Sequence, residues 1–505
     1  MAIAEHLRRV MAAGGSSAAL SFGDTSVSWE VVGGAIRALD ALLDANGVPR
    51  DAPVGLLGRN RLGAVAAFVA ILGADRPLLL INAVRPAQLV AEEVSELGLA
   101  CLVGEAADLS PEVIAAAERC GTLLLTVGAG DDAVSFSPGS AIGKGPFRLR
   151  EPGTLIEIQT SGTTGKPKRI PIAERTIEAS LRDGVRTAKG AVEQGALALK
   201  SSPSLMFTPL VHTSGTFNTL MALFEVRPVI LFEKFEAEAY RQALVHYRPK
   251  FAPLPPTALK MMVDSEATRE DFASVIAVRA GTAPLSVELQ DQFEAKFGVP
   301  VLTTYGATEF MGAATSWTLE DHRKFGQEKR GSVGRQSKGV ELRIIDPATG
   351  DVLPADQEGI LEARIDRVDG GRSWIRTTDI ARLDSDGFLY VVGRADDAII
   401  RGGFKVMAGK VADTIKAYPG VYEAIVIGRP DERLGEIPVA VVEAYPGVVI
   451  DTEMLRAHAK ASLTPYEVPA RFHFVEKLPR TVSEKISRPD VKTMLDAIEQ
   501  SEGVN

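Results

Sequence analysis

Short apolar segments alternate with amphipathic helical patterns through most of the chain, beginning near Val27. The segments have the length and composition of buried strands, and helical spacing of apolar residues fills the intervals between them. Alternation of this kind predicts stacked α/β layers. The segments expected to be strands are 52–57, 77–81, 155–158, 205–207, 229–232, 275–278 and 301–303.

The pattern changes after Gly339. Val340–Ile345 and Gly359–Ile365 are strand-like segments separated by a turn at 346–350, which predicts a β-rich part built from hairpins. The residues after Asp396 have their own strand and helix pattern, and they are numerous enough for a small separate domain.

The composition narrows the class of protein. A hydrophobic fraction of 46% over 505 residues describes a globular chain, and a net charge of −9 argues against a nucleic-acid partner. The longest uncharged apolar run, Leu62–Ala74, has 13 residues and is too short to cross a bilayer. Cys101 and Cys120 are expected to be buried thiols, and the N-terminus lacks the layout of a signal peptide. A cytoplasmic protein is therefore expected.

One loop carries the strongest chemical signal. The stretch from Thr160 to Arg169 reads Thr-Ser-Gly-Thr-Thr-Gly-Lys-Pro-Lys-Arg, and its amides, hydroxyls and ammonium groups all favour anionic oxygens. It leaves an expected strand end, where α/β proteins tend to bind ligands. The glycines are too close together for a Walker loop, and Pro167 disfavours a helix opening at Lys166. A surface turn is the alternative that this loop alone leaves open.

Further segments offer groups suited to a nucleotide. Thr304–Glu309 supplies an aromatic ring that can stack on a purine and a carboxylate that can hold magnesium. Asp379 could accept both hydroxyls of a ribose, while Arg394 and Lys485 add positive charge. Taken singly, Asp379 and Arg394 could be surface ion pairs. Tyr305 alone could be a core aromatic, and Lys485 alone a solvated charge.

In this order, the segments resemble those of the adenylate-forming superfamily of acyl-CoA synthetases, carrier-protein adenylation domains and luciferases. The resemblance extends from about Thr154 to Arg488. It implies an α/β fold with a β-barrel, made of a large N-terminal AMP-binding domain of α/β subdomains over 1–395 and a small mobile α+β C-terminal domain over 396–505. Asp396 matches the hinge between the two domains.

The resemblance also implies catalytic and metal-binding residues. Lys485 matches the lysine that bridges the substrate carboxylate and the α-phosphate. Thr308 is expected near the α-phosphate, and Glu309 is expected on magnesium with Thr164. His212 matches a histidine or aromatic position that lines the acyl channel.

Larger sets of residues are implied for each ligand. The acyl pocket is expected at His212, Thr213, Gly215, Ala280, Gly281, Gly306 and Gly312, and CoA at Gly402, Gly403 and Phe404. Adenine is expected against Tyr305 and the ribose on Asp379 with Arg394. The full ATP or AMP set is Thr160, Ser161, Gly162, Thr163, Thr164, Gly165, Lys168, Thr282, Ala283, Pro284, Thr304, Tyr305, Gly306, Ala307, Asp379, Val391, Arg394 and Lys405.

The implied reaction is ATP-dependent acid–CoA ligation with magnesium. A carboxylic acid becomes an acyl-adenylate with release of pyrophosphate, and CoA then takes the acyl group with release of AMP. Three alternatives remain open: loading of a carrier protein in trans, use of a pre-formed adenylate, and nucleotide sensing without catalysis. A monomer or a homodimer would fit.

Departures from the family pattern qualify these expectations. Glu484 stands where the family usually has glycine, Thr282 replaces a small residue, and the sequence offers no reason for Lys410. The pocket segments 211–217, 280–282 and 310–314 contain no Arg or Lys. Their composition disfavours a dicarboxylate such as malonate and favours a hydrophobic monocarboxylate.

Overall fold

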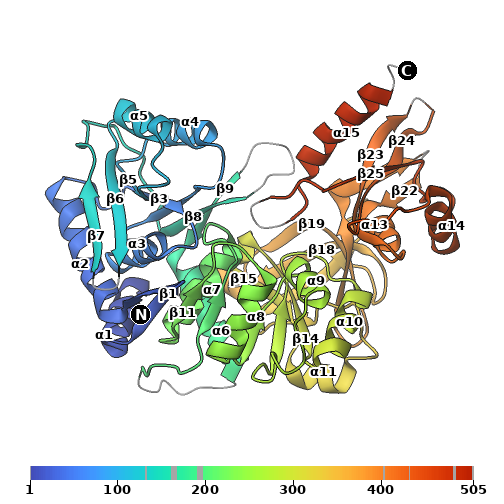
Figure 1. Cartoon of the computed structure of the whole chain (residues 1–505), viewed down its shortest axis with the longest axis horizontal. Helices are drawn as coiled ribbons and strands as arrows, with labels where there is room; N and C mark the ends of the chain where they lie inside the picture. Colours follow the sequence, from blue (N-terminus) through green and yellow to red (C-terminus); the bar gives the residue numbers. More distant parts are fainter. Residues whose placement is uncertain are drawn as a thin grey trace.

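The computed structural model describes residues 2–130, 133–160, 168–189, 197–401, 404–431, 433–481 and 485–502. Within these ranges the strands form five sheets. The chain runs from an α/β part through an antiparallel sheet to a C-terminal unit with its own sheet and helices (Figure 1). The mixed α/β organisation and the change of pattern after Gly339 are as predicted.

The first α/β layer is a seven-stranded sheet with helices on both faces. α3 (Leu62–Gly73) is buried along its whole length, beside α1 (Ile3–Gly14) and α2 (Trp29–Ala45). The opposite face carries α4 (Ala87–Leu97) and α5 (Pro111–Cys120). The strand order is β7 (Ala133–Pro138), β6 (Leu123–Gly130), β5 (Cys101–Glu105), β3 (Val54–Gly58), β4 (Leu78–Asn82), β8 (Thr154–Thr160) and β9 (Lys168–Ala173).

The second α/β layer consists of two neighbouring groups of strands. One has the order β10 (Ser204–Met206), β11 (Val229–Leu231), β1 (Ala18–Phe22) and β2 (Thr25–Ser28). The other has the order β12 (Phe251–Pro253), β13 (Ala277–Ala280), β14 (Val301–Ala307), β15 (Gly312–Ser316) and β16 (Arg335–Gln336).

Helices cover both faces of this second layer. The outer face packs against α8 (Ala237–Tyr247), α9 (Pro256–Asp264) and α10 (Val287–Phe297). The inner face packs against α7 (Thr213–Phe224), which lies beside α6 (Glu174–Lys189). The predicted phosphate loop follows β8, the turn 280–284 follows β13, and the segment 304–309 lies at the end of β14.

The antiparallel part has the order β17 (Val340–Ile345), β18 (Gly359–Ile365), β19 (Trp374–Leu383) and β20 (Leu389–Arg394). β17 and β18 pair from Val340↔Ile365 to Ile345↔Ile360, which confirms the predicted hairpin. The expected β-barrel is not confirmed. In the described residues β17 and β20 are the two ends of an open sheet, and a barrel requires its end strands to pair.

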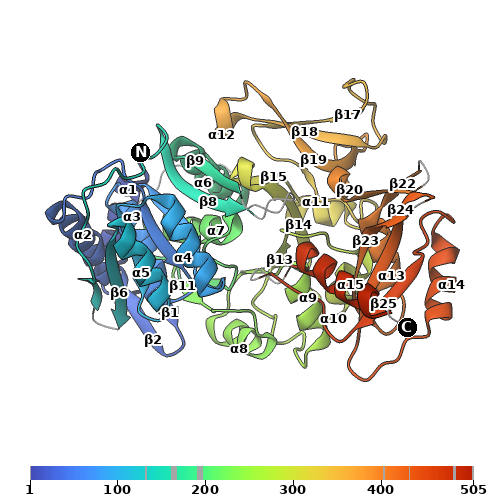
Figure 2. The same ribbon diagram turned by 90° about the horizontal axis from the view of Figure 1, so that it is seen from above.

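The C-terminal unit has a core on each face of its sheet. The strand order is β22 (Phe404–Met407), β21 (Ala398–Arg401), β24 (Gly435–Ala444) and β23 (Val421–Asp431), and β25 (Arg471–Val475) pairs with β24. α13 (Ala408–Lys416) and α14 (Thr452–Ser462) pack on one face and α15 (Arg488–Glu502) on the other. Figure 2 shows this unit beside the antiparallel sheet, and β20 contacts α13.

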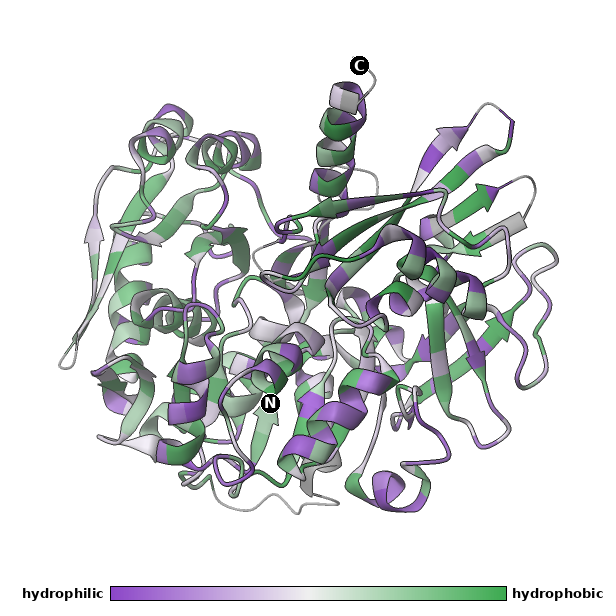
Figure 3. Ribbon diagram, turned by 45° about the vertical axis from the view of Figure 1, so that its right-hand side comes forward, coloured by the Kyte–Doolittle hydropathy of each residue, from purple (hydrophilic) through white to green (hydrophobic). Residues whose placement is uncertain are grey.

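Burial follows the hydrophobic pattern. The strands of the α/β layers are largely hydrophobic, whereas exposed helices show hydrophilic stripes (Figure 3). None of the described helices combines the length and apolar character that a membrane crossing requires. Cys101 is a buried free thiol in β5, and Cys120 is a half-buried free thiol at the end of α5.

Candidate active site

The predicted phosphate loop connects two strands of one hairpin. Thr160 ends β8 and pairs with Lys168, which begins β9. A strand, and not a helix, follows the loop, as Pro167 predicted. The remaining loop residues, with Ser161, Gly162, Thr163, Thr164 and Gly165 among them, lie outside the described residues. Arg169 is not available to the loop, because it bonds the Leu80 carbonyl at 3.1 Å and pairs with the Glu93 carboxylate.

Tyr305 and Asp379 connect the second α/β layer to the antiparallel sheet. The Tyr305 hydroxyl donates a hydrogen bond to Asp379 Oδ2. Burial and the neighbouring carboxylate raise the pKa of Tyr305, so the phenol remains a donor. Asp379 pairs in register with Arg394 across β19 and β20, and Arg394 donates to the Thr378 hydroxyl at 2.7 Å. The predicted nucleotide-binding residues Asp379 and Arg394 thus lie on adjacent strands, and Tyr305 contacts Asp379.

Thr308 lies against the start of α7. The Thr213 hydroxyl donates to Thr308 Oγ1 over 2.8 Å, which joins two segments 95 residues apart. Glu309 follows in a short 3-10 helix and is exposed. The strand before it carries Gly306, where a Cβ atom would lie 2.5 Å from the Gly312 carbonyl oxygen. Only glycine permits that approach.

Arg367 supports the predicted acyl-pocket segment around Gly312, although no local sequence pattern pointed to it. Its side chain is 7% exposed and donates to the Phe310 and Ala313 carbonyls, each at 2.9 Å. These bonds hold the backbone on either side of Gly312. A buried arginine in α12 (Asp366–Asp369) was invisible to local pattern, because its partners are more than fifty residues away in sequence.

The turn at Ala280–Pro284 has an unusual backbone. A Cβ atom at Gly281 would lie 2.7 Å from Thr304 Oγ1, and Thr304 in turn donates to the Ala280 carbonyl at 3.4 Å. Thr282 follows with φ of 70°, a conformation that is rare for a β-branched residue. Ala283 and Pro284 are exposed beside it. Strain of this kind tends to occur at ligand-binding turns.

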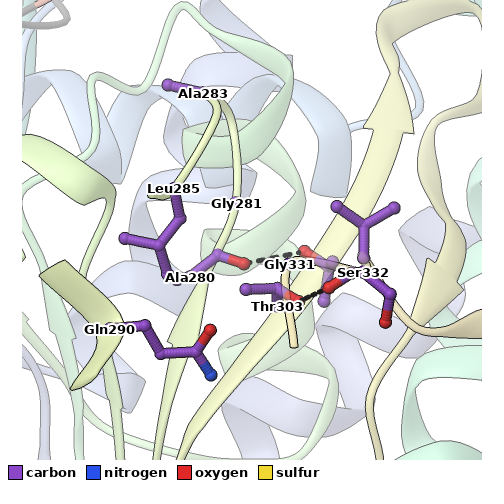
Figure 4. Close-up of a pocket in the computed structure, with 10 residues that line it drawn as sticks. Ala280, Gly281, Ala283, Leu285, Gln290, Thr303, Gly331 and Ser332 are labelled. Carbon is purple, nitrogen blue, oxygen red and sulfur yellow. Dashed lines mark hydrogen bonds between the residues drawn. The ribbon is translucent and has the colours of Figure 1, made fainter. Parts of the chain in front are cut away.

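A small cavity lies beneath this turn. It is lined by Ala280, Gly281, Thr303 and Ser332, and the Thr303 hydroxyl donates to the Ser332 carbonyl at 2.9 Å (Figure 4). Its volume of about 20 Å³ suits one water molecule. The cavity is therefore part of the turn's support and is too small for a substrate.

His212 directly precedes α7. The loop before it is anchored by buried Asn60, which donates to the Thr208 carbonyl at 3.0 Å and accepts from the Leu210 amide at 2.9 Å. Gly215 is required because a Cβ atom there would lie 2.0 Å from the Pro209 carbonyl oxygen. Among the described residues, the buried His212 Nε2 has no hydrogen-bond partner. Burial, followed by the charge of Lys485, lowers the pKa of His212 to about 4.

Lys485, in the C-terminal unit, is the charged residue that acts on His212. Its carbonyl accepts from the Thr481 amide at 2.7 Å, which returns the loop on itself. The side chain remains solvent-accessible, but surrounding protein and then Arg394 lower its pKa. Lys485 is thus close enough to influence both His212 and Arg394. Glu484 lies outside the described residues.

A second contact holds the C-terminal unit against the N-terminal layers. Lys260 Nζ in α9 lies 4.5 Å from the Tyr445 ring centroid and 5.7 Å from that of Tyr422. The Tyr445 hydroxyl lies 3.3 Å from Asp264 Oδ1. We call Lys260, Asp264, Tyr422 and Tyr445 the interdomain contact.

The remaining predicted residues are distributed along this junction. Val391 is in β20 and pairs with Ala381, and Asp396 is in a 3-10 helix at 395–397 between β20 and β21. The backbones of Phe404 and Lys405 form β22, whereas Gly402 and Gly403 lie outside the described residues. Lys410, unexplained by sequence, pairs with Glu467 at 2.7 Å.

The donor set suits magnesium bound mainly through phosphate oxygens. Among the described residues no group of three acidic, His or Cys side chains could enclose a metal ion. Mg²⁺ commonly uses one or two carboxylates together with substrate phosphates and water, and exposed Glu309 meets that need.

Comparisons with known proteins agree with this architecture. The AMP-binding enzyme family matches residues 7–367, and its C-terminal domain matches 410–485. A 4-coumarate–CoA ligase-like protein of Oryza sativa is 30% identical over 349 residues, which are 68% of this chain and 62% of that protein. The chain belongs to the AMP-binding enzyme family, as the resemblance to adenylate-forming enzymes predicted.

Solved structures share the fold across nearly the whole chain. ATP-bound MatB from Rhodopseudomonas palustris has a TM-score of 0.82 at 22% identity, with 99% of this chain and 100% of that chain covered. The amide bond synthetase McbA from Marinactinospora thermotolerans has a TM-score of 0.79 at 25% identity, covering 97% and 99%.

Proposed function

We propose that this protein is an ATP-dependent acid–CoA ligase that forms AMP. The observation that carries the proposal is the position of Lys485. A lysine from the C-terminal unit lies near His212 and Arg394, beside the elements that bear Thr308 and Asp379. Family membership and the CoA ligases among the relatives support the assignment.

In the first step, a substrate carboxylate oxygen attacks the α-phosphorus of ATP, and the bond to pyrophosphate breaks. Two anions must approach each other, so the positive charges of Lys485 and Arg394 stabilise the transition state. Asp379 binds the ribose hydroxyls, and Tyr305 orients Asp379 and lies against adenine. Glu309 would hold magnesium, which would supply positive charge to offset that of the phosphate oxygens. Positioning alone can contribute about 7–11 kcal/mol.

In the second step, the CoA sulfur attacks the adenylate carbonyl, and the bond to AMP breaks. The thiol proton leaves to solvent or to the departing phosphate. We propose that the C-terminal domain, beginning at the hinge Asp396, rotates between steps and replaces Lys485 with the Gly402–Phe404 segment. A side chain at Gly403 would then obstruct the pantetheine arm.

The acyl substrate is proposed to have an apolar body. His212 is neutral above about pH 4, so it adds no positive charge to the pocket proposed around it. Its carboxylate end lies near Thr213 and Thr308, where the α-phosphate is expected.

The test is incubation with ATP, magnesium and a panel of acids, with CoA, a holo carrier protein or an amine as acceptor. Formation of acyl-CoA together with AMP supports the proposal. If pyrophosphate is released but only the carrier protein or the amine takes the acyl group, then that molecule, and not CoA, is the acceptor. If a thioester forms only from a supplied acyl-adenylate, the protein does not catalyse the first step.

A further inference from the structure

Arg279 occupies an unusual position on an internal strand. β13 pairs with β12 on one side and β14 on the other. Its residues Ala277, Val278 and Ala280 are 0%, 0% and 2% exposed, whereas Arg279 between them is exposed. Solvent therefore reaches this one side chain in the interior of a covered sheet.

Strand alternation determines which way Arg279 faces. Val278 and Ala280 pack into the outer core with α9 and α10. Side chains alternate along a strand, so Arg279 projects to the inner face, as Gly281 would two residues later. Ala277 on the same face packs with Leu302, Trp317 and Phe388, and the charge of Glu225, directly after α7, acts on Arg279. Arg279 and Gly281, in the turn expected to border the acyl pocket, therefore lie on the same side of β13.

The Arg279 guanidinium is not committed to a carboxylate among the described residues. Its one close contact there is the Phe251 ring, whose centroid lies 5.4 Å from Cζ. The nearest acidic influence, Glu225, pairs instead with Arg227 at 3.2 Å. Surrounding protein lowers the pKa of Arg279 while solvent still reaches the side chain. The guanidinium is thus surrounded by protein while part of the side chain still reaches solvent.

A guanidinium in such surroundings suits an anionic ligand. Its planar fork matches a carboxylate or sulfonate through two parallel hydrogen bonds. Leu302 is the β14 partner of Arg279, and Gly306 lies four residues further along that strand, a distance of about 13 Å. Arg279 is thus separated from the expected carboxylate-activating end by the length of an extended acyl chain.

We propose that Arg279 is a specificity-determining residue that binds a second anionic group at the far end of the acyl substrate. The substrate class is a carboxylic acid with an apolar middle and a distal carboxylate or sulfonate. This inference rests on the proposed function and revises the expectation of a monocarboxylate. The pocket segment on which that expectation rests begins at Ala280, so it leaves out Arg279.

The test uses matched pairs of acids: suberate with octanoate, sebacate with decanoate, and dodecanedioate with dodecanoate. Calorimetric binding without ATP and pyrophosphate release with ATP are measured for the full chain and for Arg279→Met and Arg279→Lys. Arg119→Met on α5 is the control, since it removes one exposed guanidinium on a helix far from β13 (Figure 2).

At least one dicarboxylate should bind about tenfold or more tightly than its monocarboxylate partner, because a charge-assisted bond replaces an unfavourable buried charge. Arg279→Met should abolish this preference without weakening the monocarboxylate, Arg279→Lys should retain part of it, and the control should retain all. Equal or weaker binding of every dicarboxylate, or a preference that survives in Arg279→Met, would overturn the inference. A dicarboxylate preference in binding without pyrophosphate release from any acid would instead reject the proposed function.

Discussion

The Tyr305 hydroxyl donates a hydrogen bond to Asp379 across 74 residues of sequence, from the α/β layer to the antiparallel sheet. The bond restrains the carboxylate proposed to hold the ribose. Tyr305→Phe keeps the ring and removes the donor, so nucleotide affinity should fall about tenfold. Calorimetric titration with AMP measures the change. Tyr390→Phe, in the antiparallel sheet that carries Asp379, is the control and should leave the affinity for AMP unaltered. An unchanged affinity in Tyr305→Phe would show that the hydroxyl does not support nucleotide binding.

His212 should influence acid stability. Its folded-state pKa of about 4 lies below the ordinary value of 6.5, so the unfolded chain binds the proton first as pH falls. The contribution of neutral His212 is complete above pH 6.5 and is lost progressively towards pH 4. His212→Phe should therefore reduce the loss of unfolding free energy across this window, as measured by denaturant titrations. His246→Gln on α8 should follow the unaltered protein; identical slopes for all three proteins would contradict the account.

Arg367 should matter to stability and to the acyl pocket. Arg367→Met leaves the Phe310 and Ala313 carbonyls without their donor, and two buried unsatisfied groups should cost about 2–5 kcal/mol in unfolding free energy. The matched change Arg364→Met removes an exposed pair with Glu341 and should cost less than about 1 kcal/mol. Urea unfolding compares them, and equal costs would show that Arg367 has no supporting role.

The interdomain contact should favour the first step. Lys260→Met removes a cation–π interaction worth about 0.5–1 kcal/mol between the two units, so adenylation should fall two- to fivefold relative to thioester formation from supplied adenylate. Lys324→Met removes a comparable contact with Phe325 inside the N-terminal part and serves as the control. A proportional loss of both steps in Lys260→Met would mean that the contact does not discriminate between them.

Local pattern predicted the elements better than it predicted their contacts. The strand before the phosphate loop and the hairpin after Gly339 were readable because each depends on nearby residues. The barrel came from resemblance alone, and the described strands leave the sheet open.

Several site contacts could not be read from sequence. The bonds Thr213–Thr308 and Lys410–Glu467 join distant segments, so no local spacing reveals them. The positive φ of Thr282 is likewise imposed by its surroundings, because threonine by itself avoids that conformation. Arg279 was readable as a charge in a strand, but its face required the pairing of β13 with both neighbours.

We expect Lys485 to serve adenylation and not thioester formation. Lys485→Ala is assayed for pyrophosphate release from acid and ATP, and separately for thioester formation from the supplied acyl-adenylate and CoA, with exposed Lys477→Ala as the control. Pyrophosphate release should fall by about a hundredfold or more, and thioester formation should stay within about twofold of the unaltered protein. An equal fall in both reactions, or unimpaired pyrophosphate release, would show that Lys485 does not have this role.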